Sequence, residues 1–199
     1  MTNSKFIKIF FFCLFIPGIC YADSPLTSTP ISNAYEDLEI VKKAKASGEM
    51  NSEFALFLHN ESNPIDKKAA LINALGWDFN GKKNAMLYCS IIFGKQISED
   101  DITSVSAQDN FVIGYLKALD DYFYPYKAVP YLKEAQKKMD DSYTVFIILA
   151  LVRAQNADFC SSWKYVNKVF RNKDLEKDLR KEAVKIIYDY MVLYKNDCN

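Results

Sequence analysis

The side chains that could perform nucleophilic or acid–base chemistry are few and scattered along these 199 residues. The one histidine, His59, stands at the end of a short apolar segment, where a surface or capping role is commoner than that of a general base. Cys89 lies in an apolar run, and such surroundings raise the pKa of a thiol and weaken it as the nucleophile of a Cys–His pair. With one histidine and dispersed cysteines there is no zinc-ligand spacing, so the sequence predicts no metal site.

Pairs of adjacent acids are the remaining candidates for catalysis: Asp100 with Asp101, Asp120 with Asp121, and Asp140 with Asp141. All of them fall at expected helix boundaries, where carboxylates satisfy free N–H groups or complement the helix dipole. The glycine-rich phosphate loops and the GxSxG elbow of common enzyme families do not occur in the sequence. We therefore expect no catalytic residues and no cofactor, and a small carboxylate-dependent hydrolase stays as an alternative.

An aromatic cluster is the strongest indication of a binding surface. The segment Tyr122-Phe123-Tyr124-Pro125-Tyr126 follows two acids at a turn between expected helices. Exposed tyrosines gathered at one place are frequent anchors in protein interfaces. We predict that Tyr122, Tyr124 and Tyr126 contact a partner, whereas Phe123 locks the neighbouring helices together.

The composition is that of an ordinary folded protein. The 25 Lys and Arg residues balance 25 Asp and Glu, so the formal charge of zero gives no general attraction to nucleic acid or to acidic membranes. Hydrophobic residues make up 50% of the chain and aromatic residues 15%, which is enough for a core. The lysine-rich stretches are dispersed and offset by acids, so we expect a solvated surface and no nucleic-acid partner.

The N-terminal segment 1–22 has the layout of a secretory signal peptide. Lys5 and Lys8 precede an apolar run at residues 9–16, a Pro-Gly pair interrupts that run, and the small Ala22 marks an expected cleavage site. The run is shorter than the roughly 20 apolar residues of a membrane span. The sequence therefore predicts a bacterial protein of the periplasm or the exterior, without a transmembrane segment after cleavage.

Residues 23–32, rich in Pro, Ser and Thr, predict a flexible linker before a single all-helical domain at 33–199. Apolar residues recur at helical period throughout that domain, in an irregular half at 33–108 and a more regular half at 109–195. Helices are expected at 34–47, 53–58, 64–75, 82–93, 111–122, 125–139, 143–155, 159–170 and 174–194. Asp109, either Asp141 or Ser142, Asp158, and Asp174 are the predicted N-terminal residues or caps of the later helices. The helix at 82–93 is apolar nearly all round, which predicts that it is buried.

Residues 109–195 contain two helix pairs that can be aligned with each other at a constant offset. In this alignment Tyr115-Leu116 falls on Leu149-Ala150, and Tyr131-Leu132 falls on Tyr165-Val166. The segment 126–135, with alanines around bulky residues, resembles the second helix of a tetratricopeptide or Sel1-like repeat. Thin helix pairs bury their apolar faces by stacking, so we expect antiparallel pairs in a right-handed array or an irregular helical bundle.

The resemblance implies that a peptide would lie along the concave face formed by the first helix of each pair. Positions carried over from the repeat are Ile113, Lys117, Asp120, Ile147, Leu151, Lys181, Lys185 and Tyr188. The lysines would hold a carboxylate above an aliphatic floor. The alternative is that the N-terminal half covers this face, because residues 145–152 are apolar all round.

Cysteines Cys89, Cys160 and Cys198 follow the predicted cleavage site, and export permits a disulfide. Cys160 and Cys198 lie in polar surroundings and are the candidate pair, which would stabilise the fold by about 4 kcal/mol in the chain-entropy model. A straight hairpin of the last two helices would carry Cys198 more than about 10 Å past Cys160. The disulfide therefore requires the tail after Lys195 to fold back, and both outcomes stay open.

These features predict an exported, non-catalytic module that recognises a protein or peptide. An alternative is a periplasmic inhibitor or immunity protein that neutralises a cell-wall-degrading toxin, with residues 95–109 or 122–126 as a protruding loop. A repeat-type binder predicts an open groove, whereas a hydrolase predicts two carboxylates that face into a cleft. The identity of the partner and the oligomeric state do not follow from the sequence.

Overall fold

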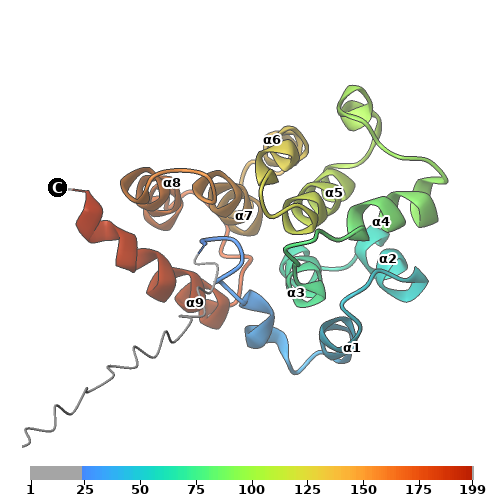
Figure 1. Cartoon of the computed structure of the whole chain (residues 1–199), viewed down its shortest axis with the longest axis horizontal. Coiled ribbons are helices and arrows are strands. Elements are labelled where there is room, and N and C mark those ends of the chain that lie inside the picture. The colour runs from blue at the N-terminus through green and yellow to red at the C-terminus, as the bar shows by residue number, and fades with distance from the viewer. Residues whose placement is uncertain (1–23, 199) are drawn as a thin grey trace, which may run out of the picture.

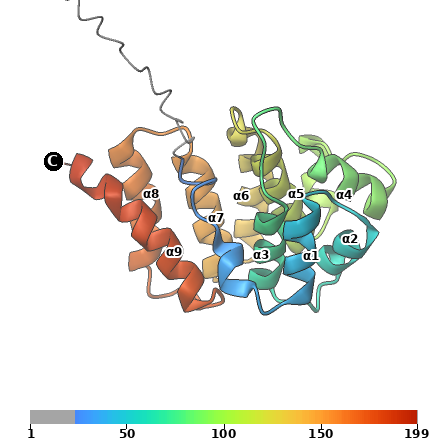
Figure 2. The same ribbon diagram turned by 60° about the horizontal axis from the view of Figure 1, so that its bottom comes forward.

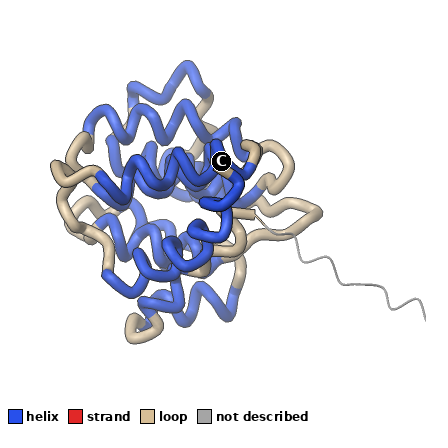
Figure 3. Tube along the Cα trace, turned by 90° about the vertical axis from the view of Figure 1, so that its left-hand side faces the viewer, coloured by secondary structure: helices blue, strands red, loops and turns tan. Residues whose placement is uncertain are grey.

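The computed structural model describes residues 24–198, so the predicted signal peptide at residues 1–22 lies outside the described part of the chain. The regular secondary structure of residues 24–198 consists of helices alone, which confirms the all-α prediction (Figure 3). The α-helices are α1 (Glu39–Ser47), α2 (Ser52–His59), α3 (Ile65–Leu75), α4 (Asn84–Phe93), α5 (Ala107–Asp120), α6 (Val129–Lys138), α7 (Tyr143–Ala154), α8 (Phe159–Arg171) and α9 (Lys181–Met191). Short 3₁₀ helices are η1 (Ile31–Tyr35), η2 (Glu99–Ser104), η3 (Pro125–Ala128) and η4 (Val192–Asp197). None of the helices in this described region is long and apolar enough to cross a membrane.

The helices stack in pairs along the molecule (Figures 1 and 2). Helix α5 packs on α6 and α7 packs on α8, while contacts between α6 and α7 join the two pairs. In the N-terminal half α1, α3 and α5 lie side by side, and α2 packs against α4. Helices α5 and α6 approach so closely that a Cβ atom on Gly114 would lie 2.7 Å from Cγ of Leu132. The absence of a side chain at Gly114 is what permits this spacing.

The segment at residues 24–35 is packed onto the helices, which corrects the prediction of a flexible linker at 23–32 for the part described. Leu26 and Ile31 are fully buried in the hydrophobic core. The backbone N–H of Leu26 donates to Oε1 of Gln155 at the end of α7, and that of Ser32 donates to Oδ1 of Asn73 in α3. Leu26 and Ile31, together with the fully buried Tyr35, anchor this segment, since each buried side chain contributes about 1.5–3 kcal/mol.

The first helix begins later than predicted. Residues 31–35 form η1, which packs against α3 and α9, and α1 starts only at Glu39. The Tyr35 hydroxyl donates to Oδ2 of Asp66, 2.8 Å away, and accepts from the backbone N–H of Arg180. These bonds hold residues 31–35 against two other helices, so the chain must turn before α1 can start.

Helix boundaries confirm some predicted caps and correct others. Asp158 caps α8 as predicted, and Ser142, one of the two predicted candidates, caps α7. The cap of α5 is Ser106, and Asp109 lies inside the first turn of that helix, so the prediction of Asp109 as the cap is wrong. The last helix starts at Lys181 and not at Asp174, because residues 172–180 run past the start of α7, where the N–H of Glu176 donates to the Asp141 carbonyl.

Helix α4 lies partly on the surface, which corrects the prediction of complete burial for 82–93. Tyr88 and Cys89 are buried, but Met86 and Ile91 are exposed to solvent. The helix ends at Gly94, whose φ of 66° lies in the left-handed region that glycine adopts most easily. The apolar outer face of α4 therefore remains open to solvent.

Cys160 and Cys198 lie at disulfide distance, with Cα atoms 4.8 Å apart, which confirms the candidate pair. Helix η4 continues directly from α9 and packs against α8, so Cys198 reaches Cys160 without the fold-back of the tail after Lys195 that was expected. The rings of Phe159 and Tyr194 stack beside the cysteines with centroids 5.1 Å apart. Cys89 is buried and free, as expected.

Candidate functional site

The structure places the predicted binding residues in three different parts of the molecule: the buried core, a cleft with its neighbouring turn, and helix α9. Ile113 is fully buried, and so are Ile147 and Leu151, which corrects the prediction that they line an exposed face. Residues 24–35 pack on α3 and α9 through η1, and the Leu26 N–H reaches Gln155 at the end of α7. The predicted alternative, in which the N-terminal part of the chain covers this face, agrees with the packing.

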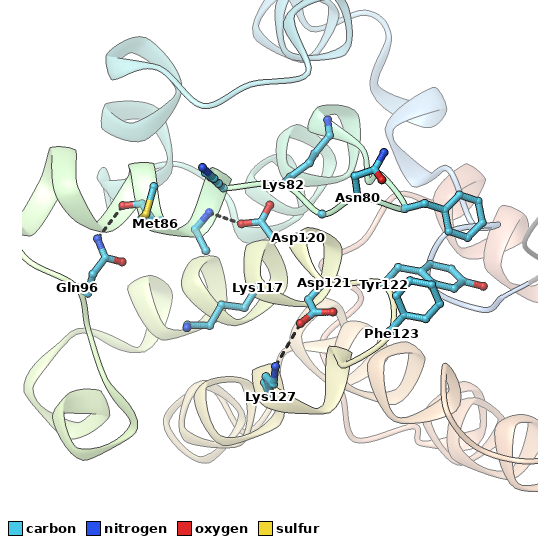
Figure 4. A pocket seen from close by; sticks show the side chains of 14 residues that line it. Asn80, Lys82, Met86, Gln96, Lys117, Asp120, Asp121, Tyr122, Phe123 and Lys127 are labelled. Carbon is cyan, nitrogen blue, oxygen red and sulfur yellow. Dashed lines mark hydrogen bonds and ion pairs between the residues drawn. The ribbon is translucent and has the colours of Figure 1, made fainter.

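A cleft of about 560 Å³ opens between α4, α5 and the loops that precede α4 and follow α5 (Figure 4). Phe79, Tyr122 and Phe123 line one end. Lys117 and Lys127 line the part away from these rings. The cleft therefore combines an aromatic wall with a charged wall in which lysines lie near Asp120 and Asp121, and it contains the predicted residues Lys117, Asp120 and Tyr122.

The aromatic wall is a network of four rings. Trp77 stacks on Tyr122 with centroids 5.0 Å apart, and the rings of Trp77 and Phe79 form a T-shaped contact with centroids 5.0 Å apart. Phe123 meets Tyr122 edge to face at 5.2 Å. Phe79 is nonetheless 52% exposed and Phe123 56% exposed, so Phe123 does not serve as the predicted helix lock. Mutual packing fixes the rings while one face of the network stays in water.

Tyr124 and Tyr126 extend this surface beyond the cleft. Both side chains are more than half exposed, and their rings meet edge to face at 6.1 Å. The Lys127 ammonium lies 4.6 Å from the centroid of the Tyr124 ring. Asp121 holds the turn, because one carboxylate oxygen accepts from the Tyr124 N–H and the other pairs with Lys127 at 3.3 Å.

Asp120 is the buried carboxylate of the cleft. One of its carboxylate oxygens, Oδ2, accepts from the backbone N–H of Ala85 at 2.7 Å, so it caps α4 from a neighbouring helix. Burial raises the pKa of this carboxyl to about 6, although hydrogen bonds from Ala85 and Asn84 and the charges of Lys82 and Lys117 act in the opposite direction. This arrangement explains Asp120 as a structural cap of α4, and the neighbouring Asp121, which also lines the cleft, pairs with Lys127.

Lys82 also has a structural role. Its ammonium donates to the carbonyls of Gly48 and Leu75, at the ends of α1 and α3. Its backbone N–H donates to the Asp120 carbonyl at 2.9 Å. The loop that precedes α4 is thereby tied to the ends of three helices, which keeps Phe79 in a fixed position beside Tyr122.

Phe79 and Lys83 line the cleft, and Trp77 packs behind its aromatic wall on Phe79 and Tyr122, although none of these loop residues was predicted. A signal was present in the sequence, since two aromatic residues follow Gly76 closely in a turn-forming stretch. What the sequence could not provide is the contact of this loop with the Tyr122 turn, because α4, η2 and α5 separate the two segments along the chain.

The remaining predicted residues, Lys181, Lys185 and Tyr188, lie on α9, away from α4 and α5 (Figure 1). Lys185 pairs with Asp189 on the same helix. The ring of Tyr188 packs against Phe170 at 5.4 Å. These residues share no surface with the aromatic cleft, so the structure does not bring all of the predicted binding residues together.

His59 and Cys89 do not form the nucleophile–base pair considered above. Nδ1 of His59 lies 3.0 Å from Oδ1 of Asp109, which also accepts from the Tyr88 hydroxyl at 2.6 Å. Burial raises the pKa of the Cys89 thiol. Residues 24–198 contain no group of His, Cys, Asp and Glu side chains arranged to hold a metal ion.

Comparison with protein-family models, with curated proteins and with solved structures finds no significant match. The chain is therefore described by its class, an all-α protein of packed helix pairs. The function must be argued from the cleft and the surfaces of the chain itself.

Proposed function

We propose that this chain is an exported, non-catalytic module that binds a protein or peptide through the aromatic cleft. The observation that carries the proposal is the exposure of Phe79 and Phe123 within a ring network that is already ordered. Large apolar side chains exposed together mark interaction sites more often than isolated ones do. Tyr124 and Tyr126 provide the rim, where each hydroxyl can also form hydrogen bonds.

The geometry supports tight recognition for a physical reason. Ordering a flexible side chain on binding costs about 0.5–1.5 kcal/mol, and the packed rings of Trp77, Phe79 and Tyr122 have already lost much of that freedom. A partner side chain that enters the cleft meets an aromatic wall on one side and the Lys117 ammonium on the other. An apolar residue next to a carboxylate suits both walls.

The exposed turn at 122–126 also favours a second candidate, the inhibitor of a secreted cell-wall-degrading toxin. Three exposed aromatic rings, those of Phe123, Tyr124 and Tyr126, lie on this turn, and such a turn could fill the active-site cleft of an enzyme. Both candidates use the same surface and differ only in the partner. The export and periplasmic location that both require are part of the proposal.

Site-specific photocrosslinking tests the proposal. A benzoylphenylalanine at position 123 should crosslink one protein in cells that produce the chain, and Phe79→Ala should abolish that adduct. Leu193, which is 65% exposed on η4, provides the control position. The same adduct from position 193, or none from position 123, would contradict the proposal, and the adduct identified by mass spectrometry separates a toxin from other partners.

A further inference from the structure

A second hollow of about 580 Å³ lies over α6, α7 and α8 and shares no lining residue with the aromatic cleft. Its charged lining residues are all cations: Lys133, Lys137, Arg153 and Lys168. In a chain with as many acids as bases, a hollow with four positive charges and no acid is a local excess of one sign.

These four cations are unpaired within residues 24–198, since no ion pair or hydrogen bond of their side chains is found there. The nearby Lys138 behaves differently and pairs with Glu134 at 3.2 Å. Like charges around one hollow repel each other in the free protein. An anionic ligand would relieve that repulsion and gain from all four charges at once.

The floor of the hollow is apolar. Phe146, Leu149 and Ala150 of α7 and Val169 of α8 line it, and the Tyr165 ring, which is 42% exposed, stands at its side. The cations come from three different helices, with Lys133 and Lys137 on α6, Arg153 on α7 and Lys168 on α8, so the charge is distributed over the lining. A ligand that uses the whole hollow must therefore carry an apolar group between separated negative charges.

We propose that this hollow binds an acidic segment of a partner polypeptide in which an apolar side chain stands between carboxylates. The apolar side chain occupies the floor, and the guanidinium of Arg153 and the lysine ammonium groups hold the carboxylates. A free phosphate would leave the apolar floor unused, and a flat lipid surface does not fill a concave hollow. The chain's own segment 1–22 contains lysines and no acid, so it does not have the charge of the occupant.

A peptide titration of residues 23–199, the chain without its predicted signal peptide, tests the proposal. The probe is acetyl-Gly-Glu-Asp-Phe-Asp-Glu-Gly-amide, and its two comparison peptides replace the acids by their amides or the Phe by Ser. Binding is followed by ¹H–¹⁵N NMR, which reports both the affinity and the residues that shift. We expect shifts at Arg153 and Tyr165, and a Kd that is at least about threefold higher for either comparison peptide and rises with salt.

Variants distinguish the hollow from general electrostatics. The double variant Lys133→Gln/Lys168→Gln should raise the Kd of the acidic peptide by about tenfold, and Arg153→Gln by about threefold, in line with partly exposed ion pairs. Lys164→Gln is the matched control, because Lys164 lies exposed on the same helix as Lys168 but outside the hollow. The control should change the Kd by less than about twofold.

Several results would overturn the proposal: equal binding of the amide peptide, an equal effect of Lys164→Gln, or no shift at the lining residues. Displacement of the peptide by an equal concentration of inorganic phosphate, or by phosphatidylglycerol vesicles, would also overturn it and would identify the anion instead as phosphate or lipid. Because no residue is shared with the aromatic cleft, none of these results bears on the crosslinking from position 123.

Discussion

The substitution Asp120→Asn should make the protein more stable at neutral pH. Burial raises the pKa of Asp120 in the folded protein to about 6, against an ordinary value of 3.8. The folded state therefore holds the proton more tightly than the unfolded chain does. The contribution of Asp120 to the free energy of unfolding is therefore greatest below about pH 4 and falls as the pH rises to about 6.

The size of the effect follows from the difference between the two pKa values. About two pKa units, at about 1.4 kcal/mol each, correspond to a loss of about 3 kcal/mol between pH 4 and pH 7. An asparagine has no charge to desolvate, and its carbonyl oxygen still accepts from the Ala85 N–H. The amide NH₂ group facing the start of α4 costs about 1 kcal/mol, so Asp120→Asn should gain about 2 kcal/mol at pH 7.

Urea unfolding and thermal unfolding of both proteins between pH 3.5 and 7.5 measure this difference. The variant should be slightly less stable than the wild type at pH 3.5 and more stable at pH 7, where its Tm rises by about 4–8 °C. Asp121→Asn is the control and should change the stability by less than about 1 kcal/mol, because Asp121 forms a partly exposed ion pair. A variant that is less stable at pH 7, with a difference independent of pH, would show that hydrogen bonds to the carboxylate outweigh its burial.

Other predictions concern the core and the tail. Burial lowers the pKa of Lys68 to about 8, so wild-type stability should rise between about pH 8 and 10.5. Lys68→Met should lack that rise and be up to about 3 kcal/mol more stable at pH 7 in denaturant unfolding, and a loss of stability there would contradict the assignment. Replacing both Cys160 and Cys198 by Ser should cost about 4 kcal/mol, and reduction of the wild type should cost the same. Gly114→Ala should destabilise by about 1–3 kcal/mol in thermal unfolding, because its Cβ would collide with Leu132 of α6, and an unchanged Tm would refute the close crossing.

Helix positions followed from the sequence wherever a local signal determined them. Ser142 and Asp158 accept from backbone N–H groups in the first turn of the helix that each one caps, and Gly94 ends α4, so each boundary depends on nearby residues alone. The start of α9 depends on contacts with a distant segment. Residues 172–180 pair with the start of α7 instead of winding into a helix, and helical periodicity contains no information about that pairing.

The candidate site was predicted in part. The turn at 122–126 was found because its aromatic residues are consecutive, whereas the loop with Trp77 and Phe79 joins it only through the fold. The basic hollow over α6–α8 was not predicted from the sequence, for the same reason. Its cations are spread from Lys133 to Lys168 over three helices, so each looks like an ordinary surface charge in the sequence.

The covered face explains why the exposed aromatic residues are found where they are. Helix α7 is apolar on nearly every side, and such a helix is stable only when other elements surround it. Residues 24–35 lie against this core, with η1 on α3 and α9 and the Leu26 N–H bonded to Gln155 at the end of α7, so the chain itself occupies part of the face that a tetratricopeptide-like array would offer to a peptide. Side chains available to a partner are then restricted to the ends and outer faces of the helices. The aromatic turn after α5 and the basic hollow over α6–α8 occupy such positions.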